Sequence, residues 1–493
     1  MSHVAWIAPV IVFLGVYALA VWTVWRAPFR ALGVLVAGAA VHNLMLMVLL
    51  RLGTPGVIVR LVQAWKEGIL LLLFALVLRE ALRAVRSGRL PRLLPIDFLM
   101  AGFAVIVVIY LLIPPAVFGA QLNLSQRVLG ARVLLQLPLL YLFGRVFFSA
   151  RRGDLIWNLS LIAGAAGVVG LLGFVEVWFI PTRAWLNGGV NLLSSWFGFT
   201  YHGPQGLPEN FFQPAGLALY IRRMVSTYVS PLPIAYTGLL VLPVATGLLL
   251  IQRRSDRATM LRVAFLAFLV IGVLLSVTRL AMLLLVLEFF MLAVIWRRRW
   301  LLWATPLAGV LVALVFVGYV RVGPLVDAHL NPVYNRPSDL RIVSTRDSSL
   351  NEHSATLAFD LQYVLHHPLG TGVGTSIHRF GASQGTGESA YFDVFGETGL
   401  FGGLAYTLAY ALMLLYGLRA LLEHRDDPLI ASLPLVSLVG GLALLPITLT
   451  SDVWSDPSVT YVLWWSAGYA VSLAALRRQG NAQPHSSLER ASA

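Results

Sequence analysis

The chain has 493 residues, of which 58% are hydrophobic and only 12% are charged. This composition excludes an ordinary soluble domain and predicts a protein with many membrane-spanning helices, because one crossing needs about 20 apolar residues. The formal net charge of +14 does not indicate a nucleic-acid-binding protein, since the arginines occur in short clusters between apolar runs. The chain contains no cysteine, which excludes disulfides and thiolate metal ligands.

Thirteen apolar runs are long enough to cross a bilayer. They are predicted to be helices, because backbone hydrogen bonds must be satisfied within lipid. The first run lacks a preceding basic segment, so we expect a retained span and no cleaved signal peptide. The predicted fold is an all-α polytopic membrane protein. The predicted spans are 5–25, 31–50, 57–82, 96–113, 130–149, 155–178, 232–251, 261–277, 279–296, 301–320, 397–421, 429–449 and 458–477.

Arginine-rich loops alternate with loops that carry few arginines. If the N-terminus is outside and the C-terminus is cytoplasmic, the arginine clusters all fall on the cytoplasmic side, as the positive-inside rule requires. An odd number of crossings gives the same placement of the two termini. The clusters lie at 26–30, 79–92, 145–152, 253–257, 297–299, 419–425 and 477–478.

This topology divides the chain into regions. The outer loop is predicted to contain an amphipathic helix at 349–366, and a further helix that begins near Gly387 and runs into the eleventh span. The regions are 1–320 with spans one to ten and an outer segment at 181–231, a large outer loop at 321–395, the last three spans at 396–478, and a cytoplasmic tail at 479–493.

Several basic residues fall on the outer side, where the positive-inside rule does not require them. Arg279 ends the sequence Ser276-Val277-Thr278-Arg279, at the tight turn between the eighth and ninth spans. Guanidinium groups bind phosphate oxygens in a forked geometry, so several outer arginines predict a polyanionic, lipid-linked ligand. The candidate ligand-binding residues are Arg222, Arg223, Arg279, Arg132 and Lys66.

Structural alternatives exist for these charged residues. An arginine at a helix end, such as Arg132, can simply extend to the lipid headgroups. Lys66 and Glu67 are neighbours that would form an internal ion pair. Glu176 and Glu288 lie within spans, where an acidic residue either pairs with an arginine or belongs to a site.

Four short motifs between residues 220 and 405 resemble those of the bacterial O-antigen ligase and polymerase superfamily. They are Arg-x-x-Ser-Thr-Tyr-x-Ser-Pro at 223–231, Ser-x-x-Arg at 276–279, His-Pro-Leu-Gly-x-Gly-x-Gly at 367–374, and Glu388-Ser389 followed nine residues later by Gly399-x-x-Gly402. Ligases of this superfamily carry histidine where this chain has Glu388. The Glu-Ser form is more similar to the polysaccharide polymerases.

The resemblance implies a GT-C-like, metal-independent glycosyltransferase of the bacterial cytoplasmic (inner) membrane, without a cofactor. It would transfer a glycan from undecaprenyl pyrophosphate to a hydroxyl of another lipid-linked repeat unit at the outer face. Donor, acceptor and membrane lipids would be its partners, with a chain-length regulator protein as a further candidate, and no nucleic acid. Glu388 would be the general base, and the outer basic residues would bind the pyrophosphate. Ser389, Tyr391 and the loop histidines, His353 first among them, are further site candidates.

Other functions compete with the polymerase. An O-antigen ligase or O-oligosaccharyltransferase would use the same donor. A transporter of lipid-linked sugars would need polar groups along a whole crossing, whereas the charges here gather on one side. The motifs of the polytopic peptidoglycan polymerases are not found. Glu388 also has a structural alternative, as the cap of the helix that follows it.

Overall fold

The computed structural model describes residues 5–88, 92–118, 120–198, 203, 206–214, 220–251, 257–319, 348–376 and 385–480. Within these residues, twelve helices are long and apolar enough to cross a membrane. The predicted all-α polytopic fold is therefore confirmed. The twelve are α1 (Ile7–Arg26), α2 (Ala31–Arg51, after the turn η1, Pro28–Arg30), α5 (Pro95–Leu112), α6 (Leu124–Val146), α7 (Arg152–Phe179), α10 (Pro231–Leu250), α11 (Arg257–Leu275), α12 (Arg279–Trp296), α13 (Arg299–Leu314, extended by η6, Val315–Tyr319), α16 (Ala390–His424), the α17–η9–α18 segment (Pro428–Leu435, Val436–Gly440, Gly441–Thr448) and α19 (Pro457–Gly480).

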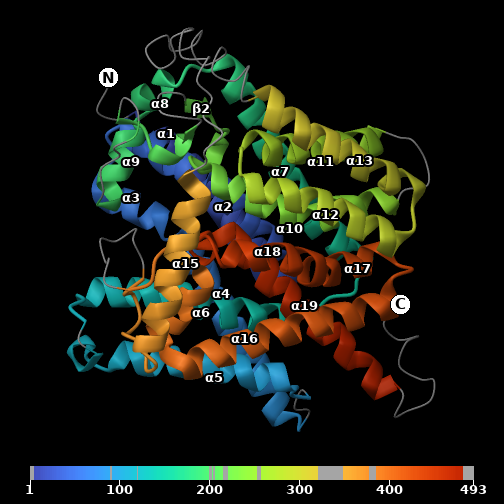
Figure 1. The fold of residues 1–493 in the computed structure, drawn as a ribbon. Helices are drawn as coiled ribbons and strands as arrows, with labels where there is room; N and C mark the ends of the chain where they lie inside the picture. The colour runs from blue at the N-terminus through green and yellow to red at the C-terminus, as the bar shows by residue number, and fades with distance from the viewer. Residues whose placement is uncertain are drawn as a thin grey trace.

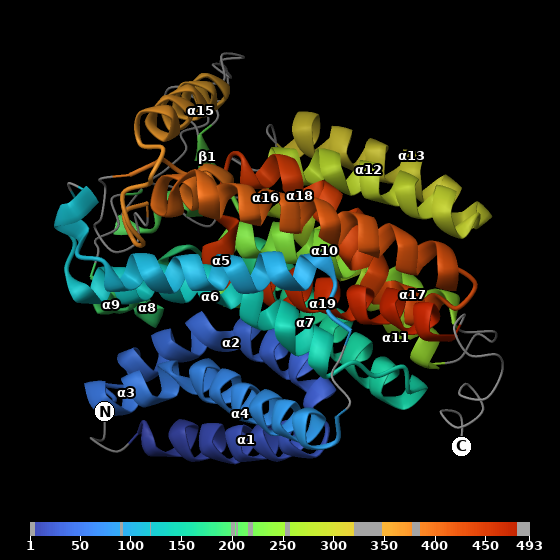
Figure 2. The same ribbon diagram turned by 90° about the horizontal axis from the view of Figure 1, so that it is seen from below.

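The predicted third span, 57–82, is not one helix. It consists of α3 (Gly56–Gln63) and α4 (Trp65–Arg86), and the chain turns between them at Ala64. Four charged residues within its first 18 positions make α4 less apolar than the other long helices. At 22 residues α4 is still long enough to cross a bilayer, and it runs beside α1 and α2 (Figure 2).

The long helices run across the picture in Figure 1, and the most buried of them lie in the middle of the bundle. In the apolar stretches of α10 and α19, 89% and 94% of the residues are buried, against 6% in α1. The bundle is therefore organised around α10 and α19, and α1 packs at its edge.

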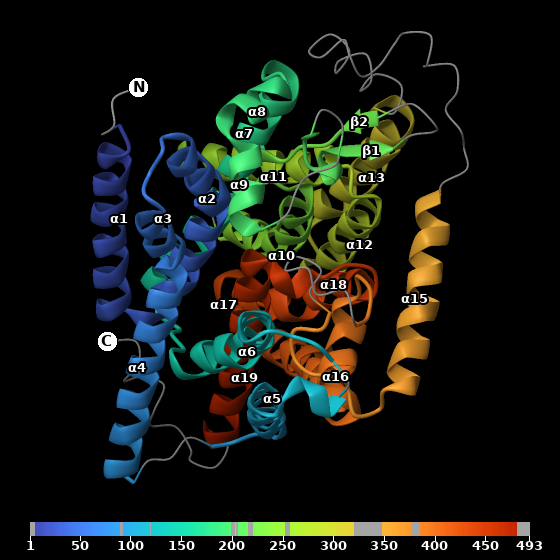
Figure 3. The ribbon, with the colours of Figure 1, turned by 90° about the vertical axis from the view of Figure 1, so that its left-hand side faces the viewer.

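The two long segments between spans lie at one end of the bundle, which we call the loop end (left in Figures 1 and 2). The first contains α8 (Arg183–Gly188), α9 (Val190–Phe197), η4 (Glu209–Phe211), an antiparallel hairpin of β1 (Phe212–Pro214) and β2 (Tyr220–Arg222), and η5 (Ser226–Tyr228). The second contains α15 (Ser348–His366), which confirms the predicted helix at 349–366. Figure 3, seen from the loop end, shows α15 along one edge.

Parts of the predicted loop and tail lie outside the described residues. These parts are 320–347, 377–384, which includes His378, and 481–493. The predicted helix near Gly387 begins at Ala390 and continues as α16 into the predicted span, with a break at Gly399. Two further short elements, η2 (Pro115–Phe118) and η10 (Val453–Ser455), complete the loop end.

Candidate functional site

Arg223 joins two of the four sequence motifs. Its Nε donates to the carbonyl oxygen of Ser276 (2.7 Å), and a terminal nitrogen donates to Oγ1 of Thr278 (2.9 Å). The backbone nitrogen of Met224 also donates to the carbonyl oxygen of Leu275 (2.8 Å). Arg223 is 8% exposed, and this burial lowers the pKa of its guanidinium to about 10, with the nearby Arg279 contributing in the same direction. The buried Arg223 remains charged at neutral pH and holds the turn that presents Arg279.

The backbone of these two motifs is strained. Among the described residues that are not glycine, four have a positive φ, and three of them are Ser226 (43°), Val229 (55°) and Val277 (51°). A β-branched valine rarely adopts this conformation, so the surrounding contacts must stabilise it. Such backbone strain is frequent at ligand-binding sites. The geometry thus supports a site at the 223–231 and 276–279 motifs.

Arg222 has different surroundings from Arg223. Its guanidinium pairs with the carboxylate of Glu176 at 2.8 Å, and the two side chains are 3% and 5% exposed. The second carboxylate oxygen of Glu176 accepts from the backbone nitrogens of Val225 and Ser226 (both 3.1 Å). Arg222 and Glu176 thus form a buried pair that fixes the start of the motif. The role of Arg222 in binding phosphate remains a prediction.

The glycine-rich 367–374 motif packs into a break in α16. Gly399 has φ +66° and ψ −171°, which interrupts the helix. The backbone nitrogens of Thr371 and Gly372 donate to the carbonyl oxygens of Gly396 (2.7 Å) and Glu397 (3.1 Å). Gly370, Gly372 and Gly374 all have positive φ, which side-chain-bearing residues rarely adopt. The loop therefore satisfies the backbone groups of the broken helix.

Glu388 precedes α16 and is exposed. The helix is capped by Ser389, whose hydroxyl accepts from the backbone nitrogen of Phe392 (3.2 Å) and donates to the carbonyl oxygen of Thr448 (3.1 Å). The backbone nitrogen of Gly387 donates to Asp360 of α15. Ser389 occupies the capping position, so Glu388 is not needed as a cap.

Tyr236, near the start of α10, connects Glu388 with the arginines. It interacts electrostatically with Glu388, Arg223 and Asp456, and its hydroxyl lies near the side chain of Ser451. Arg223 in turn interacts electrostatically with Arg279. Glu388, Arg223 and Arg279 therefore come from three motifs spread over 166 sequence positions and lie in one neighbourhood at the loop end.

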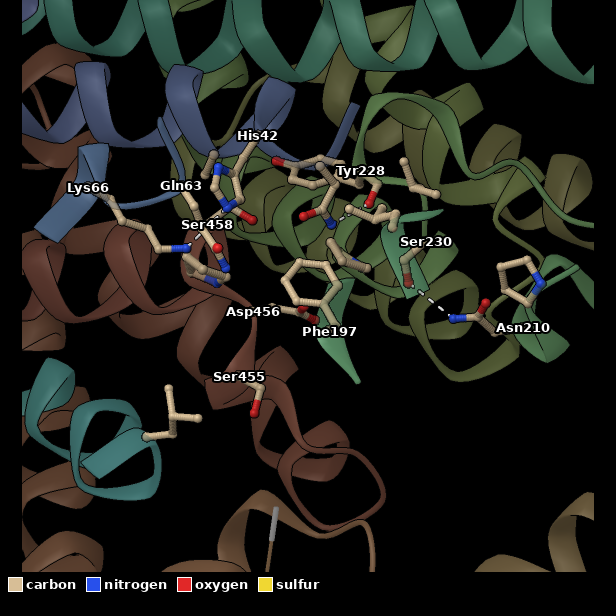
Figure 4. A pocket seen from close by; sticks show the side chains of 18 of the residues that line it. His42, Gln63, Lys66, Phe197, Asn210, Tyr228, Ser230, Ser455, Asp456 and Ser458 are labelled. Carbon is tan, nitrogen blue, oxygen red and sulfur yellow. Dashed lines mark hydrogen bonds between the residues drawn. The ribbon is translucent and has the colours of Figure 1, made fainter. Parts of the chain in front are cut away.

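Lys66 and Arg132, the other two predicted ligand-binding residues, both line a cavity of about 440 Å³ at the loop end. Lys66 is 7% exposed, and its Nζ lies 3.4 Å from Nε2 of His42 (Figure 4). The indole nitrogen of Trp65 donates to Nδ1 of the same histidine (3.1 Å). Glu67 pairs with Arg132 (3.0 Å), so the alternative of a Lys66–Glu67 ion pair is not what the structure has.

The cavity is lined by both motif residues and the ends of several helices. Tyr228, Val229 and Ser230 come from the 223–231 motif, and Asp456 comes from the turn before α19. Asp456 also interacts electrostatically with Tyr236. The cavity therefore adjoins the neighbourhood of Glu388 and Arg223.

The remaining candidates lie in other surroundings. His353 is exposed on α15. Tyr391 lies in an aromatic cluster, and its hydroxyl is 3.1 Å from that of Thr407. His367 stacks on Tyr363 (4.3 Å between ring centroids), which favours a structural role. Glu288 is fully buried in α12, and neither of its carboxylate oxygens has a hydrogen-bond partner among the described residues.

No group of three or more histidine or acidic side chains among the described residues is arranged to hold a metal ion. Acidic side chains do gather under the glycine-rich loop. Glu397 accepts from the backbone nitrogen of Ser376 (3.2 Å), and Asp393 accepts from the hydroxyl of Thr386 (2.5 Å). These bonds attach the loop to α16, so the carboxylates of Glu397 and Asp393 have a structural role.

Part of the chain that contributes to this site is similar to a known protein family. Residues 263–407 match a family model described as O-antigen ligase. A search of curated proteins finds no significant match. The match spans three of the four motifs and less than a third of the chain, and it confirms the resemblance to the O-antigen ligase and polymerase superfamily over that region. It supports, in general terms, a multi-pass membrane enzyme that transfers glycans from lipid-linked oligosaccharides.

Several residues near this site were not predicted from the sequence to be functional. Tyr236, Asp456 and the pair His42-Asn43 are single polar positions in or beside apolar runs. Polar groups within predicted spans are unusual enough to indicate a functional or packing role. That signal was present for His42-Asn43, but the partners of these residues could not be read from the sequence.

Proposed function

We propose that this protein is a polysaccharide polymerase of the outer face of the bacterial cytoplasmic membrane, with the N-terminus outside and the C-terminus cytoplasmic. It transfers a glycan from undecaprenyl pyrophosphate to a hydroxyl of another lipid-linked repeat unit. One observation carries the proposal: three separate motifs are linked at the loop end, because Tyr236 interacts electrostatically with Glu388 and Arg223, and Arg223 in turn interacts with Arg279. A carboxylate and two guanidinium groups are the charged groups that this transfer needs.

Each of these groups has its own role in the proposed reaction. Glu388 takes the proton from the acceptor hydroxyl while the hydroxyl oxygen bonds to the anomeric carbon of the donor. The bond between that carbon and the pyrophosphate oxygen breaks, and its electron pair stays on the pyrophosphate. Arg279 and Arg223 stabilise the charge that develops there. Arg132 and Lys66, at the adjoining cavity, are auxiliary phosphate ligands in this proposal.

The arginine pair suits an anionic leaving group for a physical reason. Arg223 is buried, and Arg279 lies within electrostatic range of it. Two like charges held close together in a poorly solvated place repel one another, and a bound anion relieves that repulsion. A pyrophosphate carries the required charge and accepts hydrogen bonds from forked guanidinium groups.

A transfer assay tests the proposal. Purified protein in lipid vesicles is given undecaprenyl-pyrophosphate-linked repeat units, and the products are separated by size. A ladder of polymers with released undecaprenyl pyrophosphate is the expected result. A single transfer to a lipid A core or to a protein acceptor, without a ladder, would instead establish the ligase, the function in the family description. No transfer to any of these acceptors would refute glycan transfer by this protein.

A further inference from the structure

The cavity beside the arginines is lined by apolar residues and by a set of polar side chains. Three of its lining side chains are amides, Asn43, Gln63 and Asn210, contributed by α2, α3 and the segment before β1. Its volume of about 440 Å³ falls in the range of small-molecule sites, about 300–1,000 Å³. All three amides are partly exposed, as expected for side chains that border a cavity.

Each amide is fixed by one hydrogen bond through one of its two polar groups. Nδ2 of Asn43 donates to the carbonyl oxygen of Tyr228 (2.8 Å), and Nδ2 of Asn210 donates to Oγ of Ser230 (3.2 Å). In Gln63 the oxygen is the anchored group, because it accepts from the indole nitrogen of Trp196 (3.0 Å). An amide has both a donor and an acceptor, and the described residues provide no hydrogen bond to the other group, which can therefore serve a ligand. The cavity thus borders two fixed acceptors and one fixed donor.

Aromatic and hydroxyl groups complete the lining. Figure 4 shows the ring of Phe197 between Lys66 on one side and Asn210 on the other. The hydroxyl of Ser458 lies 2.8 Å from that of Thr237. Lys66, Arg132 and Asp456 also line the cavity. The neutral donors and acceptors around the aromatic ring match a part of the ligand that has hydroxyl groups at its rim and C–H groups on its faces. That is the chemistry of a sugar ring.

We propose that this cavity is a saccharide-binding site, in which Asn43, Gln63 and Asn210 bind a sugar unit of the lipid-linked glycan and select which glycan is accepted. The inference rests on the proposed function, and it assigns the substrate part that the arginines do not recognise. The motif residues Tyr228 and Ser230 anchor two of the amides, so the sugar would lie beside the pyrophosphate. Fixed amides bind hydroxyl groups without first losing their own rotational freedom.

The test compares two ligands in the same purified protein. One is the lipid-linked glycan extracted from membranes of cells that make this protein, and the other is undecaprenyl pyrophosphate without sugar. The wild-type protein is expected to bind the glycosylated lipid more tightly. Gln63→Met keeps nearly the length of the side chain, removes the amide donor and adds no charge to the cavity. It should weaken binding of the glycosylated lipid by about threefold to tenfold, the loss of one hydrogen bond, and leave the bare lipid unchanged.

Two further variants keep the test decisive. Asn210→Ala removes a second amide, and the same selective loss is expected from it. Asn191→Ala removes an amide from an exposed position of α9 outside the cavity, and it should change neither affinity. Equal wild-type affinity for both lipids, or unchanged affinity in both cavity variants, would overturn the saccharide site. An equal loss for both lipids would overturn it as well, because it would mean that these amides bind the pyrophosphate and not the sugar. Because wild-type transfer activity is measured separately, each of these results is distinguishable from a failure of the proposed function.

Discussion

Three arginines that are close in sequence or in space have different surroundings, and their roles differ accordingly. Arg222 is buried in an ion pair with Glu176. Arg223 is also buried, but it donates to the backbone and side chain of the 276–278 turn. Arg279 is partly exposed at the start of α12. Arg222 therefore has a structural role, and Arg223 combines a structural role with a charge near the proposed pyrophosphate, whereas Arg279 has the exposure that direct contact with a substrate requires.

Replacing Arg279 should affect chemistry more than stability. Arg279→Ala is expected to lower glycan transfer by at least about 10²-fold, because a fixed cation no longer stabilises the leaving group. Arg279→Lys should recover little, since lysine lacks the forked geometry. Transfer rate and unfolding temperature are measured together, with Arg183→Ala, an exposed arginine that starts α8, as the control. Normal transfer by the alanine variant would show that Arg279 only contacts lipid headgroups.

Replacing Arg222 should have the opposite effect. Arg222→Ala leaves the carboxylate of Glu176 buried without its partner, which typically costs about 3–5 kcal/mol. Chemical unfolding in detergent should register this loss. Arg83→Ala breaks an exposed pair with Glu80 at the far end of α4 and should cost at most about 1 kcal/mol. If Arg222→Ala unfolded like the wild type but failed to bind donor, Arg222 would be a phosphate ligand.

At the scale of elements, the site depends on a broken helix. The glycine-rich loop donates hydrogen bonds to α16 at the break, and α15 supplies Asp360 to the turn before Glu388. A continuous α16 would leave the loop without these partners and would change the direction in which the chain enters the helix. Gly399 therefore determines where Glu388 lies, although it touches no reacting group.

Substituting Gly399 should consequently destabilise the protein. A Cβ at this position would lie 2.6 Å from the backbone carbon of Leu369, and φ is +66°. Gly399→Ala is expected to cost at least about 1–3 kcal/mol and to lower the unfolding temperature. A Cβ added at Gly309 of α13 would meet no atom within 4 Å, so Gly309→Ala is the matched control. An unfolding temperature equal to that of the control would mean that the break is not required.

The elements that could be predicted from the sequence are those set by hydrophobicity. Long apolar runs predict spans because the backbone must satisfy its hydrogen bonds within lipid. The spacing of apolar residues predicted α15 in the same way. The division between α3 and α4 was not predicted, since the apolar pattern continues through Ala64. The hairpin of β1 and β2 was missed because two strands of three residues carry too little pattern.

The candidate site was predictable in part for the same kind of reason. Charged residues on the outer side are unusual, and this singled out Arg279, Arg132 and Lys66. Their partners come from distant positions: Arg132 pairs with Glu67, 65 residues away, and Lys66 lies against His42. Contacts of this kind depend on how helices pack, which a single sequence does not encode in any local pattern.

At the scale of the whole molecule, the loop end gathers every residue proposed to act on substrate. The arginine clusters of the short loops and the charged loop end are consistent with one orientation, with the loop end outside. Cysteine labelling of this cysteine-free chain tests it. Ser354→Cys on α15 should react with an impermeant thiol reagent in intact cells, and Ser87→Cys after α4 should react only after lysis. The reverse pattern would contradict the orientation.

The central claim is that Glu388 accepts the proton of the attacking hydroxyl at a site where arginines hold the pyrophosphate. The most direct measurement compares transfer rate and donor affinity for Glu388→Gln in one purified preparation. The variant keeps the shape of the side chain but removes its basicity, so transfer should fall by about 10²–10⁴-fold while the affinity for the lipid-linked donor stays unchanged. A near-normal transfer rate in Glu388→Gln would contradict the account and make His353 the next candidate for the base.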